Sequence, residues 1–448
     1  MKPLLKIPIV ALALLALPLR AGEMVVRSFS SAAPDGDRVL EHVQEKAVIA
    51  EYLDPMDTGI GKSIATLLWR ETLTAISDQA GAGVILARAP EGERLVELLE
   101  TEYHDAAVRI AEFQEARMAL WGAALEQSDK IFLNTHLSLI SSSRSQFIDF
   151  KIKDFVNDRR SEGSLQLVLP RTKFNFSTIV TSRDELFKRV VMTRGETAIY
   201  GAPDRSSGVV RQVAADTPLS SIDLRGDWFR ILLDDGSTGW VQGNRVDVPP
   251  ARVRIDRSGI NLRSSPTTVG DTVVANADVK GIFPVLQQRY TSRSGLWYQI
   301  PLGGRPVWIA SFLTEPLFSV PSIHFVGGLY RYYAGRYRDA VREFQRFIDH
   351  PGVEQENVNL STAYQYQALA MLLDGSSTQR AEATLQKAIM QTPYDSTIYQ
   401  IQALTYIGEP GMTVKLNTSL EQALEFDPRQ NDTGSFVNTI RNGYLHDQ

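Results

Sequence analysis

The run Asp227-Trp228-Phe229-Arg230, followed by Gly239-Trp240-Val241, recurs further along the chain as Leu296-Trp297-Tyr298-Gln299 followed by Val307-Trp308-Ile309. In each copy two aromatic residues open a short alternating strand, and a second strand carries another tryptophan. Turn residues separate the two strands, as a hairpin requires: Asp234-Asp235-Gly236 in the first copy and Gly303-Gly304 in the second. The repetition predicts two small β-units of one kind, an arrangement more typical of a modular binding protein than of an enzyme.

The stretch that precedes each hairpin follows the same order. The first copy opens with Ala198-Ile199-Tyr200-Gly201-Ala202-Pro203 and the second with Ile260-Asn261-Leu262-Arg263-Ser264-Ser265-Pro266. A short polar loop then leads to a pair of valines, Val209-Val210 in the first copy and Val273-Val274 in the second. Opening, loop, valine pair and hairpin therefore recur in one order, which chance similarity does not readily produce.

This ordered repeat resembles the tandem bacterial SH3 (SH3b) family. The resemblance implies one SH3-like barrel at 190–248 and another at 251–316, each a small module that binds protein or cell-wall ligand. Pro249-Pro250 lies between the two barrels. We therefore expect the barrels to fold as separate units, with protease-sensitive links near 249–252 and 316–322.

The first residues read as an export signal. Lys2 and Lys6 precede an apolar run at 7–19, which is shorter than the roughly 20 residues that span a bilayer, and small residues follow. We expect a signal peptide at 1–22 and a soluble, periplasmic or otherwise exported mature protein. Ser31-Ala32-Ala33 is an alternative cleavage region, and an uncleaved anchor is the other interpretation.

Length and composition limit the remaining possibilities. A chain of 448 residues exceeds what one core supports, so two to four domains are expected. The net charge is −5 and both signs are mixed along the chain, which gives no indication of nucleic-acid binding. The sequence contains no cysteine, and this excludes disulfides, thiolate metal sites, a cysteine nucleophile and a lipidated cysteine.

After a flexible lead-in at 23–38, an α/β domain is expected over 39–189. Apolar periodicity predicts alternating elements: a strand at 47–50, a helix at 61–76, a strand at 84–87, a helical stretch at 90–116, strands at 118–126 and 130–140, and a closing helix at 182–190. Three stretches carry a family resemblance: Ile60-Gly61-Lys62-Ser63-Ile64-Ala65, Ala119-Leu120-Trp121-Gly122-Ala123 and Phe174-Asn175-Phe176. The domain resembles the curli-secretion component (CsgG-like) and TolB-N-terminal-like exported domains. Since the lipid-bearing cysteine of that family is missing, a membrane-anchored channel is not expected.

Gly59-Ile60-Gly61-Lys62-Ser63 looks like the end of a phosphate-binding loop. That motif requires another glycine five residues before Gly61, and Met56 stands there. We therefore predict a glycine-rich turn into a helix, with N-terminal amides capped by Ser63 or water, and no nucleotide site.

The C-terminal third, 322–448, is predicted to be helical and repetitive. Small and apolar residues recur at spacings of four and three in three sets: Ala340, Phe344 and Phe347; Ala381, Leu385 and Ala388; Leu416, Leu420 and Ala423. This pattern resembles the tetratricopeptide repeat, with inter-helix turns at Gly335-Arg336-Tyr337, Asp374-Gly375 and Glu409-Pro410-Gly411. The resemblance implies about three helix pairs and a capping helix near 433–445, with insertions near 352–358.

The sequence gives little sign of catalysis. The six histidines are scattered, no two share a metal-ligand spacing, and no Gly-x-Ser-x-Gly nucleophile turn occurs. Asp234-Asp235 falls in a predicted hairpin turn, where aspartate favours the backbone geometry. We expect no catalytic residues, no metal and no cofactor, with an enzyme in 39–189 as a distant possibility.

Candidate binding residues follow from the two resemblances. In the helical repeats, the first helix of each pair lines the concave face of the family, which places Tyr332, Tyr333 and Tyr366 there, while packing within the repeat is the competing interpretation. In the barrels, the opening loops supply Tyr200, Arg205 and Arg263. For the recurring tryptophans Trp228, Trp240, Trp297 and Trp308, core packing is favoured over ligand contact.

The sequence thus predicts a multidomain α+β protein: an α/β domain, two SH3-like barrels and a helical solenoid. As function we expect a non-catalytic exported scaffold that binds envelope proteins through the barrels and the helical groove. A peptidoglycan-associated targeting protein is the main alternative. No transmembrane segment is expected in the mature chain.

The first prediction concerns cleavage of the signal peptide. N-terminal sequencing of the protein from an envelope fraction should find the mature end between Ala21 and Asp35, because the lysines and the short apolar run specify cleavage rather than anchoring. Recovery of intact Met1 in a membrane pellet would contradict it.

Overall fold

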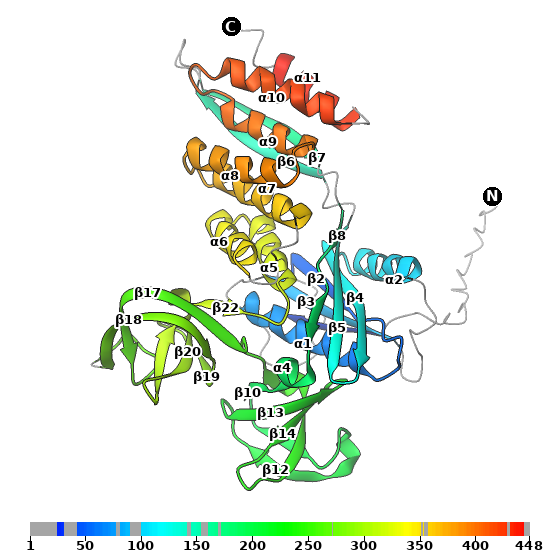
Figure 1. Cartoon of the computed structure of the whole chain (residues 1–448), viewed down its shortest axis with the longest axis vertical. Coiled ribbons are helices and arrows are strands. Elements are labelled where there is room, and N and C mark those ends of the chain that lie inside the picture. Colours follow the sequence, from blue (N-terminus) through cyan, green and yellow to red (C-terminus); the bar gives the residue numbers. More distant parts are fainter. Residues whose placement is uncertain are drawn as a thin grey trace, which may run out of the picture.

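The structure is a computed structural model that describes residues 25–30, 43–77, 81–89, 100–140, 145–153, 160–168, 172–270, 272–350, 353, 357–427 and 431–442. The expected signal peptide lies outside these residues, and so does most of the insertion expected near 352–358. Four parts follow one another along the chain, an α/β part, two β-units and a helical array (Figure 1). Among the helices of the described residues, none has the length and apolar character needed to cross a bilayer.

The α/β part is built on a mixed sheet. Its strands run in the order β1-β3-β2-β4-β5-β8, with β9 also paired to β5. Their bounds are β1 (Val25–Ser30), β2 (Glu45–Ala50), β3 (Ala82–Arg88), β4 (Met118–Gln127), β5 (Lys130–Leu139), β8 (Lys173–Asn175) and β9 (Ile179–Thr181). Strand β2 runs parallel to both β3 and β4. Alternate residues of β2 enter two cores, Ala47 and Ile49 on the α1 side and Val48 and Ala50 on the α2 side.

Helices α1 (Ile60–Ala75) and α2 (Glu100–Phe113) therefore cover opposite faces, and a short helix, α4 (Arg183–Phe187), closes the part. The strands and helices predicted here are confirmed, except that the closing helix expected at 182–190 ends at Phe187 and a strand begins at Arg189. Residues 90–99 lie outside the described residues. The prediction of a flexible lead-in at 23–38 was wrong in part, because β1 lies within this segment. Strand β1 pairs with β3 through its backbone, which needs no apolar periodicity.

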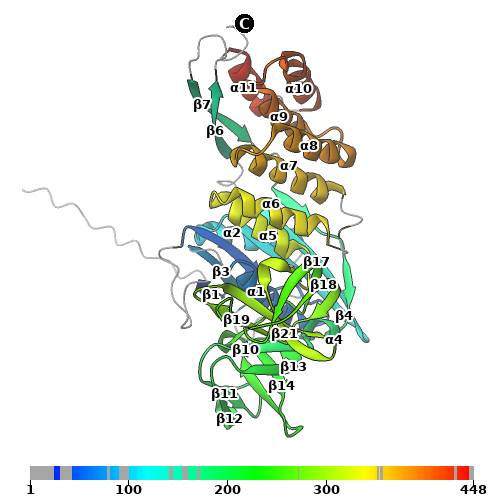
Figure 2. The same cartoon turned by 90° about the vertical axis from the view of Figure 1, so that its left-hand side faces the viewer.

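A second missed feature is the hairpin of β6 (Ser145–Lys153) and β7 (Arg160–Val168), inserted between β5 and β8. The hairpin leaves the sheet and lies beside α9 and α11 at the far end of the helical array (Figures 1 and 2). Leu167 of β7 is fully buried there. The α/β part thus reaches the C-terminal helices along the chain's long axis.

Packing explains the glycines that look like a phosphate loop. A Cβ atom at Gly61 would lie 2.1 Å from the Tyr52 carbonyl oxygen, so only glycine allows α1 to start this close to β2. Ser63 does not cap the helix as expected. Its hydroxyl donates to the Leu224 carbonyl at 2.9 Å and accepts from the Gly226 amide at 3.1 Å, both in the first β-unit.

The first β-unit comprises seven strands in the order β12-β11-β15-β14-β13-β10-β16. They are β10 (Arg189–Thr193), β11 (Thr197–Tyr200), β12 (Val209–Val213), β13 (Pro218–Arg225), β14 (Trp228–Leu232), β15 (Thr238–Gln242) and β16 (Val246–Asp247). Its core is continuous with that of α1, since Phe229, Val241 and Leu224 belong to the same buried cluster as Ile64 and Leu68.

The second β-unit has its own core around Val253, Ile255, Tyr298 and Ile300. Its strands run β18-β17-β21-β20-β19, with β22 paired to β17. They are β17 (Arg252–Arg263), β18 (Val273–Pro284), β19 (Gln287–Thr291), β20 (Gly295–Leu302), β21 (Arg305–Ala310) and β22 (Glu315–Leu317). Gly303 and Gly304, both with positive φ, make the tight turn between β20 and β21.

A polar stripe on α1 attaches the first β-unit. Four side chains spaced three or four residues apart donate to its backbone carbonyls: Ser63 to Leu224, Thr66 to Gly226, Arg70 to Val246 and Thr74 to Val248. Pro249 and Pro250 are buried next to this contact, and Phe318 and Val320 are buried further on. The first β-unit therefore packs on α1, and the links in which protease cleavage was expected contain buried residues, while separate folding of the barrels stays a prediction.

Helices α5–α11 stack in consecutive pairs and end in a single helix (Figure 1). They are α5 (Ser322–Tyr333), α6 (Tyr337–Ile348), α7 (Asn357–Leu373), α8 (Thr378–Gln391), α9 (Ser396–Tyr406), α10 (Thr413–Phe426) and α11 (Asn431–Ile440). The expected turns hold Gly335, Gly375 and Gly411, all with positive φ, and the three predicted sets of small and apolar residues are buried. The pairing and the spacing are thus observed, while the tetratricopeptide assignment itself stays a prediction.

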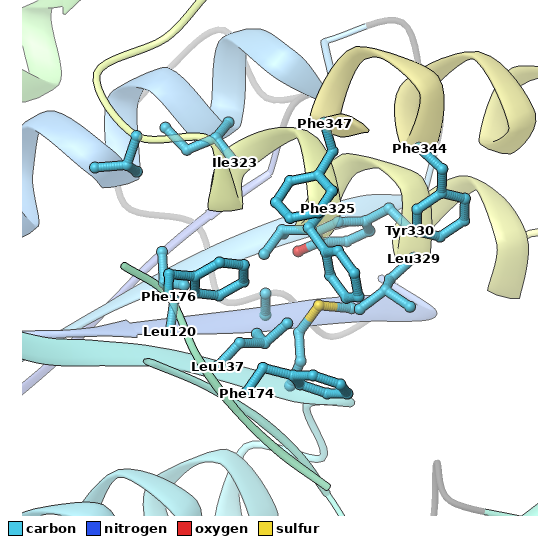
Figure 3. Packing of buried hydrophobic residues seen from close by; sticks show 14 of the residues in the cluster. Leu120, Leu137, Phe174, Phe176, Ile323, Phe325, Leu329, Tyr330, Phe344 and Phe347 are labelled. Atoms are coloured by element: carbon cyan, nitrogen blue, oxygen red, sulfur yellow. The ribbon is translucent and has the colours of Figure 1, made fainter. Parts of the chain in front are cut away.

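Helix α5 packs on the sheet of the α/β part rather than facing solvent. The Phe325 ring lies 5.4 Å from Phe174 and 6.0 Å from Phe176 on the sheet side, and 5.2 Å from Phe347 on the α6 side (Figure 3). The Tyr330 hydroxyl donates to the Gly83 carbonyl of β3. The helical array and the sheet therefore share one core.

A buried ion pair lies where three parts meet. Glu71 of α1 is fully buried and binds Arg189 of β10, whose side chain is 2% exposed. Ser319, in the segment that leads into α5, donates to Glu71 from its amide at 2.9 Å and from its hydroxyl at 2.8 Å, and accepts from Arg189 at 3.0 Å. One carboxylate thus joins the α/β part, the first β-unit and the start of the helices.

This ion pair makes the second prediction. Glu71→Met or Arg189→Met alone should lower the free energy of unfolding by about 3–5 kcal/mol, because each leaves a buried charge unpaired. The double variant Glu71→Met with Arg189→Met should cost clearly less than the sum of the single changes. Urea unfolding followed by tryptophan fluorescence measures all of these.

The matched control is Asp256→Asn, which breaks an ion pair with Lys280 whose side chains are 74% and 73% exposed. It should change stability by about 1 kcal/mol or less. Single variants at Glu71 or Arg189 that behave like this control would show that the buried pair does not hold the three parts together.

Candidate functional site

The outer face of β11, β15 and β14 in the first β-unit carries a group of aromatic and polar side chains. Directly opposite residues of antiparallel strands share a face, and Trp240 pairs with both Tyr200 and Arg230, while Trp228 pairs with Gln242. The alternate residues of these strands, such as Phe229 and Val241, point into the core. We call the outer group, Tyr200, Trp228, Arg230, Trp240 and Gln242, the aromatic face.

Tyr200 and Trp228 form its accessible part. Their rings meet edge to face, with centroids 5.5 Å apart and an interplanar angle of 87°. Both side chains are only partly buried, unlike the other three repeated tryptophans. Partly exposed aromatic rings next to polar groups are typical of ligand contact because they offer apolar area and a polar edge together.

Arg205 joins this site from the loop between β11 and β12. Its guanidinium donates to the Gln242 side-chain oxygen at 2.6 and 3.2 Å, which places it next to Trp228. The loop is ordered by its own hydrogen bonds, since Asp204 accepts from the Ser206 amide at 3.0 Å and Ser207 accepts from the Ala202 amide at 3.0 Å. Hydrogen bonds from Ser206 lower the pKa of the Asp204 carboxyl, which keeps it an acceptor. The sequence predictions for Tyr200 and Arg205 therefore fall on one surface.

Two arginine side chains lie close to the ring of Trp240. The guanidinium groups of Arg225 and Arg230 lie 5.8 and 6.0 Å from the centre of its ring, and the residue is 8% exposed. Arg230 also donates to Thr238 at 3.4 Å. This surface can therefore present a guanidinium to an anionic or carbonyl group of a ligand beside the rings of Tyr200 and Trp228.

The second β-unit repeats the strand pairing but closes the matching face. Trp308 pairs with Arg263 and with Gln299, as Trp240 pairs with Tyr200 and Arg230. Here Trp297 and Trp308 are 2% and 5% exposed and form a small buried cluster with Ala310. Arg263 stands at the position of Tyr200 and donates to Thr272 at 2.8 Å. Trp297 and Trp308 thus pack in a buried cluster, as favoured from the sequence, whereas Trp240 is buried on the outer face and Trp228 is only partly buried.

Of the three tyrosines expected on the helical groove, two are buried and one is partly buried. Tyr332 and Tyr366 are 6% and 1% exposed, and their rings meet at 5.2 Å. Tyr333 is partly buried under the Arg117 guanidinium, 4.8 Å above its ring. This placement favours the packing interpretation, because the sheet covers the side of the array that the resemblance assigns to ligands.

Further contacts fill the same side of the array. Asn359 of α7 donates to the Asn175 carbonyl of β8 at 2.8 Å. The sequence could not show this coverage, because the covering strands lie more than a hundred residues away.

Within the described residues no three histidine, aspartate or glutamate side chains gather as metal ligands. Asp235 accepts from the Ser237 amide at 2.9 Å, which is the turn geometry expected for Asp234-Asp235.

Comparisons with known proteins address the β-unit that carries the aromatic face. A sequence model of the bacterial SH3 domain family matches residues 195–247. A search of curated proteins finds no match. Among solved structures, NlpC1 and NlpC2 from Trichomonas vaginalis are similar over short stretches, with 10% and 9% sequence identity and a TM-score of 0.16 for each.

Those alignments cover 29% and 33% of this chain, and 46% and 55% of the two structures, so the chain spans about half of their length. Similarity at this level carries no argument about fold or activity. The family match agrees with the strand order and with the aromatic pattern of the first β-unit. Residues 195–247 therefore form a bacterial SH3 domain.

Proposed function

We propose that this chain is a non-catalytic, exported binding protein of the cell envelope that holds peptidoglycan through the aromatic face of its SH3 domain. The observation that carries the proposal is the pair Tyr200 and Trp228, half-exposed beside Arg205 and Gln242 on a surface whose equivalent in the second β-unit is closed. Bacterial SH3 domains are associated with cell-wall binding, which supports this ligand class.

The arrangement suits a peptide-bearing polymer. Aromatic rings pack against sugar faces or apolar side chains, while Arg205 and Arg230 offer donors to carboxylate or carbonyl oxygens. The domain is fixed to α1 by four side-chain hydrogen bonds, so the surface is held in place before a ligand arrives. A preorganised surface loses less conformational entropy on binding.

A scaffold for envelope proteins is the second candidate. The repeated strand pairing supports a second SH3-like barrel at 251–316, and the paired helices with glycine turns support tetratricopeptide repeats after 322. In such a scaffold, protein partners would contact exposed parts of these modules, since the tyrosine-lined side of the array is filled from within the chain.

The aromatic face makes the third prediction. In a pelleting assay with purified peptidoglycan, Tyr200→Ala and Trp228→Ala should each weaken binding by roughly thirtyfold, which corresponds to about 2 kcal/mol at a binding hot spot. Their thermal stability should fall less than that of Trp240→Ala, which removes a buried indole and should cost about 3–5 kcal/mol.

Tyr394→Ala is the matched control because this tyrosine is 75% exposed on the helical array. It should bind like the unchanged protein. Equal pelleting of all variants would refute the aromatic face as the cell-wall site. Recovery of defined envelope proteins after the peptidoglycan has been digested, with loss in the Trp228→Ala variant, would favour the scaffold instead.

A further inference from the structure

Two histidines lie where the second β-unit meets the helical array. His324 is in the first turn of α5 and is 1% exposed, and His350, just after α6, is partly buried. The centres of their rings are 6.2 Å apart. Both residues lie outside the aromatic face and the ion pair of Glu71, so neither has a part in the proposed function.

The His324 ring joins the second β-unit to α6. Its Nδ1 atom lies 3.1 Å from a carboxylate oxygen of Glu343 in α6, and its Nε2 atom lies 3.0 Å from the carbonyl oxygen of Pro316 in β22. Burial alone would raise the pKa of this carboxyl, but Arg331, Arg346 and His324 outweigh burial and hold that pKa well below its usual range. Both partners of the ring therefore only accept hydrogen bonds. A ring that bonds both carries a proton on each nitrogen and a positive charge.

His350 is held in its neutral form. Burial is the largest of the effects that lower the pKa of His350 from 6.5 to about 4, and the charges of His324 and Arg254 act in the same direction. A hydrogen bond to the Phe318 backbone raises the pKa but is outweighed. The neutral His350 ring thus donates to the Phe318 carbonyl and places no second positive charge beside His324.

Arg254 of β17 adds a contact from the second β-unit. Its guanidinium donates to the Asp349 carbonyl, next to His350, at 3.1 Å and lies 4.0 Å from the Glu315 carboxylate of β22. Besides Glu343 and its arginines, the charged or titratable groups that face His350 here are His324 of α5, Asp349 at the end of α6, Arg254 of β17 and Glu315 of β22. We call this contact the histidine joint.

The second β-unit has the independence that a movable part needs. It has a core of its own, around Val253 and Tyr298. Beside the histidine joint, a cleft of about 520 Å³ has Tyr290 of β19 on one wall and Arg342 of α6 on another, so the unit does not pack along the whole of α6. Strand β22 is only three residues long, and it therefore depends on the support that the joint gives it.

We propose that the histidine joint is an acid-sensitive latch: protonation of His350 separates β22 from the end of α6 and releases the second β-unit from the helical array. Two positive rings repel each other strongly at this distance in a buried site, and in the open state water solvates both. The device is independent of the proposed cell-wall site.

The direction of the pH effect follows from His350. Its pKa is lower in the closed joint than in water, so the open state binds the proton more tightly. The closed joint is therefore fully stable above about pH 6.5 and loses stability as the pH falls toward 4. Glu343 stays ionised throughout this window, because its pKa lies well below it.

Hydrogen exchange of the full-length protein, read by mass spectrometry at about pH 7.5 and about pH 5 and corrected for the intrinsic rate at each pH, measures this opening. The opening equilibrium of 315–321 and of the end of α6, 345–350, should rise roughly thirtyfold between the two pH values. Both segments should respond together, because they are the two sides of the joint. Peptides from β14 and α9 should change less than about threefold, since they lie outside the joint.

Three variants assign the effect to His350. His350→Asn keeps a donor for the Phe318 carbonyl but takes up no proton, so it should remove the pH dependence. His350→Lys carries a charge at both pH values and should show the increased opening already at about pH 7.5. His104→Asn is the matched control, because His104 lies in α2 with its side chain 28% exposed, and it should respond like the unchanged protein.

The proposal fails if the opening of 315–321 is the same at both pH values or if His350→Asn keeps the full change. Equal opening of β14 and α9 in acid would also overturn it, because the protein would then unfold as a whole rather than at the joint.

Discussion

The arrangement of this protein depends on one buried carboxylate, Glu71. An ionised side chain in the interior is costly unless every oxygen finds a donor, and the donors here come from two other parts of the chain, Arg189 and Ser319. The contact is satisfied only when β10 and the segment before α5 lie against α1 together. Helix α1 is thus the element that fixes the mutual position of the sheet, the SH3 domain and the helical array.

This constraint decides where ligands can bind. The array packs its first helices on the sheet, with Phe325 between the rings of Phe174, Phe176 and Phe347, so the side lined by tyrosines is interior. Binding surfaces remain on the β-units. Tyr200 and Trp228 face outward from the SH3 domain. Four hydrogen bonds from α1 hold this domain in place, which is an advantage for recognition.

Local structure was predictable where a few residues close together in the sequence determine it. The tryptophan hairpins, the glycine turns between helices and the alternation of strands and helices in the α/β part follow from spacing, and the structure contains them. Tyr200 and Arg205 were also placed together, because both belong to the opening loop of the first copy. The glycines that resemble a phosphate loop include Gly61, which the structure explains by its close approach to Tyr52.

Long-range packing was not predictable from the same patterns. Ser63, Thr66, Arg70 and Thr74 look like a solvated face of α1, yet they bind carbonyls of the SH3 domain, and a periodic pattern cannot say whether water or protein accepts a hydrogen bond. The sequence leaves the same question open for Tyr332 and Tyr366. An aromatic residue on a helix can contact a ligand or pack against a neighbouring helix or strand, and its spacing is the same in both cases. Strand β1 pairs through its backbone and leaves no side-chain signature.

Native-state hydrogen exchange of the full-length protein at increasing urea, read by mass spectrometry, tests the central claim that α1 unites these parts. If Glu71 and the shared core hold them as one body, the slowest amides of α1, of β14 in the SH3 domain and of α5 open with one common free energy and respond to urea with one slope. Exchange of the β14 amides through a separate opening of lower free energy, while α1 and α5 stay protected, would contradict it.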